Sequence, residues 1–214
     1  MKVLHIDTSA NLAGNSRLLT RYLVDQLAAD EIVVRDVAQE NLPLMTAETL
    51  MRFYNHEQGS VANGDLLRHL TVSETLIAEL VSADVVVLGV PMYNFGVPAY
   101  LKNWIDHVAR RGQTFRYGEN GPEGLIGYTR VYVVASSGGT PIGSAADHAS
   151  SHLSQVFSFL GATSVDIIDA NGSKGSPAQI IESGKNQIDG LVQKKIVDQN
   201  RAHQNLNEAR VQSI

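Results

Sequence analysis

The chain has 214 residues, 43% of them hydrophobic, so it is long enough to bury one substantial core. Its 17 basic and 22 acidic residues give a net charge of -5, which argues against nucleic acid as the main partner. The absence of cysteine excludes a disulfide framework, a thiolate nucleophile and a cysteine-bound metal centre. The apolar run after Met1 is too short for a signal peptide, and no stretch approaches the roughly 20 residues that span a bilayer. We therefore expect a cytoplasmic protein with no membrane and no nucleic-acid partner.

Short β-branched runs alternate with longer amphipathic segments along the chain. Several of the short runs are almost continuously apolar, which is typical of strands that are covered on both faces. The expected strands are residues 2–7, 31–37, 84–91, 130–136 and 164–169. The expected helices, which carry apolar residues on one stripe, are residues 16–29, 65–82, 98–109, 145–160 and 177–198.

Strict alternation of strand and helix predicts an α/β fold with a parallel sheet and right-handed crossovers. With five strands, the flavodoxin-like doubly wound order 2-1-3-4-5, with helices on both faces, is the simplest choice. We expect one domain over residues 1–198 and a polar tail over residues 199–214. Such sheets bind ligands outside the carboxyl ends of their strands, so the loops after strands one, three and four are the candidates for a site.

The loop after the first strand, from Thr8 to Arg17, has the composition of a phosphate site. Hydroxyl side chains of Ser9 and Ser16 can donate to an anion, and the free N–H groups of the following helix add positive potential. Arg17 either adds charge or points to solvent, and Ser16 alone is equally typical of a helix cap. The loop has neither a G-x-G-x-x-G nor a P-loop pattern, so a single phosphate suits it better than a pyrophosphate.

The loops after strands three and four favour a flat ring beside that phosphate. Residues 91–98 (PMYNFGVP) carry apolar and aromatic side chains that can border a ring, although the same turn could simply cover the core. Residues 135–141 (ASSGGTP) have paired glycines that allow close backbone approach, although Ser-Gly-Gly is also common in ordinary loops. Three suitable loops at the three expected positions together indicate one ligand site.

Three segments resemble the FMN-dependent NADH azoreductase family, within the flavodoxin-like quinone reductases. They are PMYNFGVPAYLKNWIDHV (residues 91–108), TFRYGENGPEGL (114–125) and SSGG (136–139), and the resemblance covers roughly residues 2–192. It implies an FMN cofactor, NADH as electron donor, small aromatic electron acceptors and a homodimer in which both chains shape each pocket. The first loop departs from the family, because relatives often have a Ser-x-Ser pair and one more residue where this chain has Gly14-Asn15-Ser16.

The resemblance also implies site residues. Tyr117 is similar to a pocket-wall residue near the flavin, and Phe159 to one that reaches the site from a partner subunit. The FMN phosphate is expected at Ser9, Asn15, Ser16 and Arg17, the isoalloxazine at Met92, Tyr93, Asn94 and Phe95, and its pyrimidine edge at Ser136, Ser137, Gly138 and Gly139.

The expected activity is hydride transfer from NADH or NADPH by a ping-pong mechanism to quinones and to aromatic azo compounds, whose azo bond would be cleaved to two amines. The flavin carries the chemistry, so no side chain is needed as a nucleophile, and Asn94 or Tyr117 could assist proton delivery. We expect no metal, since His148 and His152, four residues apart, lack the pattern of a metalloprotease helix. The alternative is a flavodoxin-type electron carrier that serves a protein partner, but flavodoxins are shorter, more acidic and lack a segment like residues 110–128.

Overall fold

Seven strands and six helices follow one another in the part of the chain that the computed structural model describes, which is residues 1–55, 64–127, 129–172 and 175–211. Their order is β1 (Lys2–Asp7), α1 (Asn15–Leu27), β2 (Glu31–Asp36), α2 (Ala47–Asn55), α3 (Gly64–Val81), β3 (Val85–Pro91), α4 (Ala99–Val108), β4 (Phe115–Gly118), β5 (Gly121–Gly124), β6 (Arg130–Ser136), α5 (His148–Leu160), β7 (Ser164–Asp169) and α6 (Pro177–Val211).

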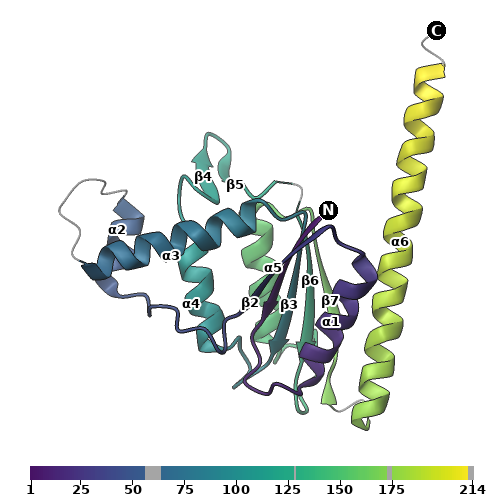
Figure 1. Ribbon diagram of the computed structural model, residues 1–214, viewed down its shortest axis with the longest axis horizontal. Helices are drawn as coiled ribbons and strands as arrows, with labels where there is room; N and C mark the ends of the chain where they lie inside the picture. The colour runs from purple at the N-terminus through teal and green to yellow at the C-terminus, as the bar shows by residue number, and fades with distance from the viewer. Residues whose placement is uncertain (56–63, 128, 173–174, 212–214) are drawn as a thin grey trace.

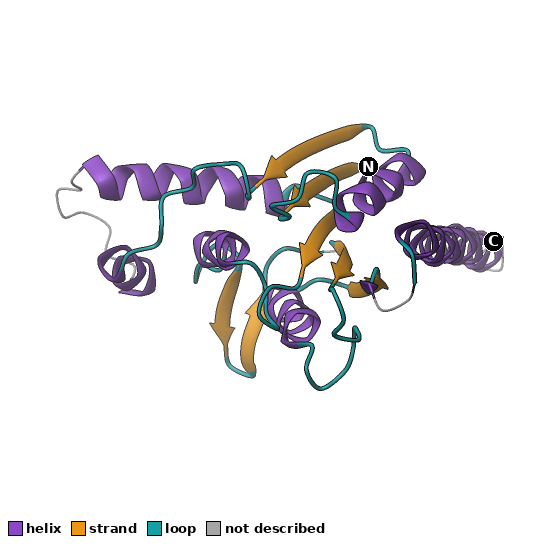
Figure 2. Cartoon of the chain, turned by 90° about the horizontal axis from the view of Figure 1, so that it is seen from below, coloured by secondary structure: helices purple, strands orange, loops and turns teal. Residues whose placement is uncertain are grey.

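Five parallel strands form the central sheet in the order β2-β1-β3-β6-β7. This is the flavodoxin-like order 2-1-3-4-5, so the predicted fold is confirmed. Helices α3, α4 and α5 cover one face and α1 and α6 the other (Figures 1 and 2). The order reverses at β1, whose neighbours are β2 on one side and β3 on the other, and a ligand crevice is expected at that point.

The two layers divide the side chains of the central strands between two cores. All seven residues of β3 are buried, and they alternate between the faces as strand geometry requires. Val86 and Leu88 contribute to the core under α3, α4 and α5, whereas Val85 and Val87 contribute to the core under α1 and α6. A strand that is apolar on both faces can only lie inside a three-layer sandwich, which explains the continuous apolar run in the sequence.

The observed elements differ most from the expected ones in four places. Helix α2 and the antiparallel hairpin β4–β5 were not predicted, because one is a short helix and the other consists of four-residue strands rich in glycine. Helix α5 begins at His148 rather than at residue 145, since the Asp147 side chain accepts from Ser150 N (2.9 Å) and caps it there. Helix α6 continues past residue 198 to Val211, and the division into residues 1–198 and 199–214 stays a prediction.

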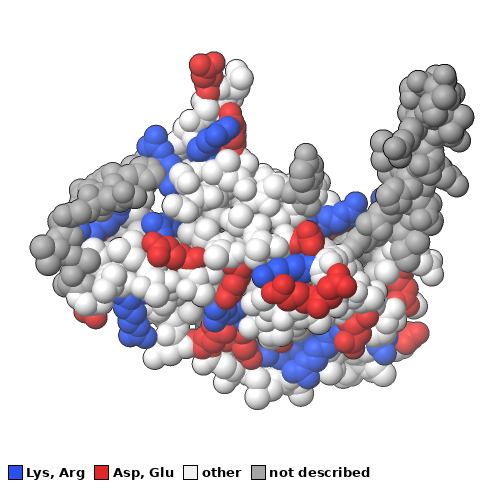
Figure 3. Space-filling view, turned by 45° about the horizontal axis from the view of Figure 1, so that its top comes forward, with Lys and Arg blue, Asp and Glu red and all other residues white. Residues whose placement is uncertain are grey.

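Acidic and basic side chains are interspersed over the described surface that faces the viewer in Figure 3. Within the residues that the structure describes, no helix is both long enough and apolar enough to cross a bilayer.

The β4–β5 hairpin is held against the end of α5 by a contact between two glycines. A Cβ atom at Gly124 would overlap the backbone of Leu160 and Gly161, so only glycine allows this approach. Gly161 itself has a φ of 102°, the left-handed conformation that ends a helix, and Ile126 N donates to Leu160 O at 3.1 Å. The hairpin, which carries Tyr117, therefore has its position fixed by α5.

We predict that Gly124→Ala lowers the free energy of unfolding by about 1–3 kcal/mol, because the new methyl group must push the hairpin away from α5. Chemical denaturation measures the change. Gly190→Ala is the matched control, since Gly190 lies in α6 with open space around its Cα. The control should be neutral or more stable by up to about 1 kcal/mol. Equal stability of the two variants would contradict the close approach.

Candidate functional site

The carboxyl ends of β1, β3 and β6 meet at one edge of the sheet. In the register of the strands, Asp7 is paired with Gly89, and Pro91 with Ser136. The three loops that follow these strands therefore begin side by side. Thr8 N and its hydroxyl both donate to Gly89 O, at 3.1 and 2.7 Å, which fixes the start of the first loop on β3.

The first loop ends in an uncapped helix N-terminus. Gly14 occupies the N-cap position of α1 and no side chain accepts from the first turn, so its N–H groups are free for a ligand. The Ser16 hydroxyl is buried and has no hydrogen-bond partner within the described protein. The loop itself is ordered by Asn11, whose backbone N donates to the Ser9 hydroxyl (3.2 Å) and whose carbonyl accepts from Gly14 N (3.0 Å). This arrangement presents several donors to one point.

Arg17 does not point to solvent and its guanidinium is not directed at the loop's free donors. It is 2% exposed and donates to both carboxylate oxygens of Asp36 at 2.7 Å, to Asp7 Oδ2 at 3.1 Å and to Ser9 O at 3.1 and 2.6 Å. These bonds engage all three nitrogens of the guanidinium. The side chain therefore stabilises the loop from below and links β1, β2 and α1 through hydrogen bonds.

Asp7 is the second charged member of this buried cluster. Burial raises the pKa of its carboxyl. A hydrogen bond from His5, the charges of His5 and Arg17, and the Thr20 hydroxyl lower the pKa by more than burial raises it. The net pKa of Asp7 therefore lies below its ordinary value. The pKa of Arg17 is raised, chiefly by its hydrogen bond to Asp36. Both groups are therefore charged at neutral pH.

The second loop is a tight turn in which two residues have left-handed backbone. Tyr93 and Gly96 exchange both backbone hydrogen bonds at 3.1 Å, and Asn94 and Phe95 between them have φ values of 50° and 67°. Positive φ at two non-glycine residues costs about 1–3 kcal/mol each, and such strain collects at functional sites. The turn is held in place at both sides, because Met92 N donates to Ser136 O (2.6 Å) and Ala10 N to the Tyr93 hydroxyl (3.3 Å).

The third loop is supported from behind by the segment that follows β7. The Ser137 hydroxyl donates to Thr140 O, and Asn171 Nδ2 donates to the same carbonyl at 3.0 Å. Gly172 N donates to Ser137 O at 2.7 Å, and a Cβ at Gly172 would come within 2.8 Å of Gly138 O. Gly172 thus permits two backbones to lie against each other, while Gly138 and Gly139 are exposed and have open space around them.

The three loops line an open cavity of about 220 Å³. Eight of the residues expected at the cofactor line it, together with four that the sequence did not single out, namely Asn11, Gly14, Pro91 and Ala170. The eight are Ser9, Asn15, Ser16, Met92, Tyr93, Ser136, Ser137 and Gly138. Asn94, Phe95 and Gly139 are exposed beside the cavity rather than in its lining, and Arg17 lies beneath it.

A larger and more open hollow adjoins this cavity at Tyr93. It has a volume of about 1160 Å³ and a mainly apolar lining that includes Asn94, Val97 and Tyr100. His148 and His152 also line it. Among the described side chains, no three His, Cys, Asp or Glu residues come together as metal ligands would.

Tyr117 and Phe159 lie together but outside the cavity of their own chain. Tyr117, on β4, is 58% exposed and makes an edge contact with Phe115, whose ring is 4.6 Å from that of Phe159 on α5. Tyr117 lines a separate hollow with Leu50 and other residues of α2 and α4. The structure thus joins these two aromatics to each other and not to the three loops.

The fold and the site define a flavodoxin-like protein, and similar known proteins agree with this. A model of the flavodoxin-like fold family matches residues 1–192. An FMN-dependent NADH:quinone oxidoreductase of Azotobacter vinelandii is 44% identical over 177 residues, covering 80% of this chain and 87% of that one. One of Colwellia psychrerythraea is 35% identical over 193 residues, covering 88% and 99%. The chain belongs to the family of FMN-dependent NADH:quinone oxidoreductases.

Solved structures share the fold at lower sequence identity. An azoreductase of Bacillus anthracis superposes with a TM-score of 0.79 at 24% identity, covering 90% of this chain and 99% of that one. An FMN-dependent NADH-azoreductase of the same species, in complex with FMN, gives 0.77 at 18% identity, covering 90% and 98%.

We predict that Arg17→Gln lowers the free energy of unfolding by about 3–5 kcal/mol, because it leaves the buried Asp7 carboxylate without its charged partner. Urea denaturation at neutral pH measures the loss. Arg116→Gln is the control, since Arg116 pairs with Glu123 on the exposed hairpin and its loss should cost no more than about 1 kcal/mol. An Arg17 variant as stable as this control would show that the buried ion pairs of Arg17 do not stabilise the fold.

Proposed function

We propose that this chain binds FMN and transfers a hydride from NADH (or NADPH) to quinones and to aromatic azo compounds. The observation that carries the proposal is the meeting of three loops around one cavity, where an uncapped helix N-terminus and a buried, unpartnered Ser16 hydroxyl face the same space. The relatives that carry the name FMN-dependent NADH:quinone oxidoreductase support the choice of cofactor and donor.

The phosphate of FMN suits the first loop. A buried hydroxyl without a partner costs about 1–3 kcal/mol, and a phosphate oxygen at Ser16 would remove that cost. The free N–H groups at the start of α1 and the positive end of its dipole favour an anion in the same place. The Arg17 guanidinium contributes indirectly, since it holds Ser9 O and so fixes the loop that presents these donors.

The flavin ring suits the second and third loops. Met92 and Tyr93 line the cavity beside Ser136, Ser137 and Gly138, so apolar side chains and a polar backbone edge border the same space. FMN held here would supply the two-electron chemistry between the nicotinamide and the acceptor. The chain's part is to orient the ring, and the doubly held Tyr93–Gly96 turn gives the rigidity that orientation requires.

The larger hollow beside the cofactor cavity supports a ping-pong order, because we propose that the electron donor and the acceptor use it in turn. The larger hollow meets the cofactor cavity at Tyr93, and we propose that donor and acceptor both reach the ring from that side. We therefore expect the oxidised nicotinamide to leave before a quinone or azo compound enters. Azo cleavage to two amines would take two such turns, whereas a quinone takes one. Initial rates measured against both substrates should give parallel double-reciprocal lines, and intersecting lines would contradict this order.

A homodimer would complete each pocket. Phe159 and Tyr117 are packed together through Phe115 yet lie outside the cavity of their own chain, which fits a role at the cavity of a second copy. Sedimentation equilibrium tests this: a mass of two chains supports it and a mass of one contradicts it. The cytoplasmic location stays a prediction of the sequence.

Ser16→Ala should separate cofactor binding from folding. It removes a buried hydroxyl that has no partner in the protein, so the stability of the FMN-free chain should be unchanged or slightly higher. The dissociation constant for FMN should rise about tenfold, because the phosphate loses one donor. Fluorescence titration with FMN measures it.

Ser164→Ala is the control for this titration. Its hydroxyl is also buried and unpartnered, but it lies at the start of β7, at the other edge of the sheet. FMN affinity should be unchanged in this variant. If both variants bind FMN as the wild type does, the phosphate is not held at Ser16.

Asn94 and Tyr117 are the side chains that we propose for proton delivery. Asn94→Gly keeps the positive φ of the turn while removing the amide, and Tyr117→Phe removes only a hydroxyl from an exposed ring. In the variant that removes the proton donor, turnover with menadione should fall about 100-fold while FMN remains bound. Tyr22→Phe is the control, because the Tyr22 hydroxyl of α1 donates to Asp189 of α6, away from the three loops. Wild-type turnover in both test variants would exclude both side chains.

A further inference from the structure

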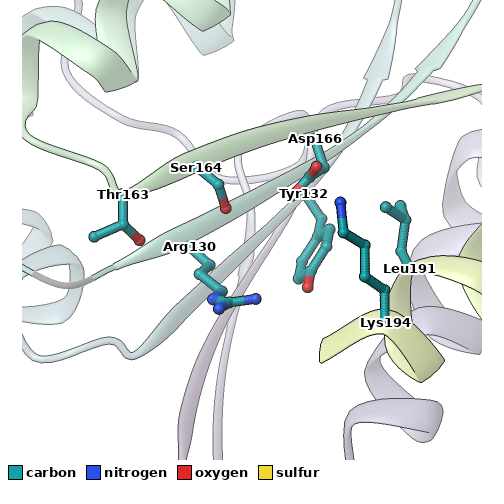
Figure 4. Close-up of a pocket in the computed structure, with 7 residues that line it drawn as sticks. All are labelled: Arg130, Tyr132, Thr163, Ser164, Asp166, Leu191 and Lys194. Atoms are coloured by element: carbon teal, nitrogen blue, oxygen red, sulfur yellow. The ribbon is translucent and has the colours of Figure 1, made fainter. Parts of the chain in front are cut away.

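A second polar cavity lies at the amino edge of the sheet, at the opposite end of β6 from the three loops. It has a volume of about 230 Å³ and is formed where α6 passes the first residues of β6 and β7 (Figure 4). Its lining is Arg130, Tyr132, Thr163, Ser164, Asp166, Leu191 and Lys194. Arg130 begins β6 and Ser136 ends it, so about 20 Å of strand separates these two lining residues.

Hydrogen-bond donors dominate this lining. Arg130 and Lys194 reach it from opposite walls, and the hydroxyl of Ser164 points to the same side as the Arg130 guanidinium (Figure 4). Of the side chains that the structure describes, none provides a carboxylate within ion-pair distance of either cation. The Ser164 hydroxyl is buried without a partner. Two cations that have no carboxylate partner among the described side chains and an unsatisfied hydroxyl in one hollow are the groups that an oxyanion would satisfy.

Tyr132 and Asp166 add to the specificity of the hollow. Burial raises the pKa of the Tyr132 hydroxyl, and the charge of Asp166 adds to the rise against the opposing effect of Arg130, so this group is a donor at neutral pH. Asp166 is the one carboxylate in the lining, and a carboxylate can only accept. A ligand that satisfies both the donors and the Asp166 carboxylate thus needs an anionic group and, next to it, a hydroxyl or amine.

We propose that this cavity binds a small phosphate- or carboxylate-bearing metabolite that also carries a hydroxyl, with the anion at Arg130, Ser164 and Lys194 and the hydroxyl at Asp166. Because Arg130 and Lys194 belong to β6 and α6, the ligand bridges the sheet and the last helix. Its binding therefore stabilises the contact between α6 and the sheet and raises the thermal midpoint as its concentration rises.

Calorimetric titration of the FMN-loaded protein, in chloride buffer, with inorganic phosphate and then with glycerol phosphate tests the site. We expect saturable binding, about tenfold weaker in Arg130→Gln and in Lys194→Gln, because each loses a charge-assisted bond. Lys185→Gln, on the same helix and directed at the Tyr22 ring, is the control and should bind as the wild type does. Glycerol phosphate should bind more tightly than phosphate, and Asp166→Asn should abolish that difference.

Binding of both anions unchanged in Arg130→Gln and Lys194→Gln would mean an adventitious ion only and would overturn the site, as would no saturable binding to the wild type. Circular dichroism shows whether each variant is folded. If Arg130→Gln does not fold, the exposed Lys194 decides the result alone. Because the variants locate the binding at this cavity, the test stands whether or not FMN occupies the other edge of the sheet.

Discussion

The buried ion pairs of Arg17 are the interaction on which the functional edge of this protein depends. Its guanidinium joins Asp7 at the end of β1, Asp36 at the end of β2 and the carbonyl of Ser9 in the first loop. Burying charge is costly unless every group is paired, and here each nitrogen of the guanidinium has a partner. The cluster therefore fixes the loop from below, which leaves the loop's own donors free for a ligand above it.

The same parallel strands have different surroundings at their two ends. At the carboxyl edge, the three loops converge because β1, β3 and β6 are neighbours, and the loops bring backbone donors and aromatic side chains to one cavity. At the amino edge, α6 passes β6 and β7 and leaves a hollow lined by charged and hydroxyl side chains. The first is the crevice that this topology creates in general. The second depends on the particular side chains of this chain.

Much of the fold followed from the sequence, because buried parallel strands are continuously apolar and so are easily distinguished from amphipathic helices. The hairpin β4–β5 could not be predicted from the sequence. Its four-residue strands are positioned by the contact of Gly124 with Gly161 and have no apolar pattern of their own. Local pattern also could not predict a contact between segments that are distant in the chain.

For the candidate site, the loops were predictable and the directions of side chains were not. Ser16 and Tyr93 were expected at the cavity and line it. Arg17 was expected either at the phosphate or in solvent, but two aspartates from different strands bind it beneath the loop, and strand pairing alone brings them there. Ala170 was missed because it follows the last strand, whose end was not considered. Asn11 was also missed, because no sequence motif indicates that its backbone hydrogen bonds order the first loop.

The proposed function requires this chain to hold FMN and to reduce it with NADH. The most direct test is the visible spectrum of the purified protein after FMN is added, the excess is removed and NADH is then supplied without oxygen. We expect the flavin bands to be retained and to bleach promptly. Bands that are retained but do not bleach would indicate an electron carrier of the flavodoxin type. A protein that retains no flavin would contradict the proposed function.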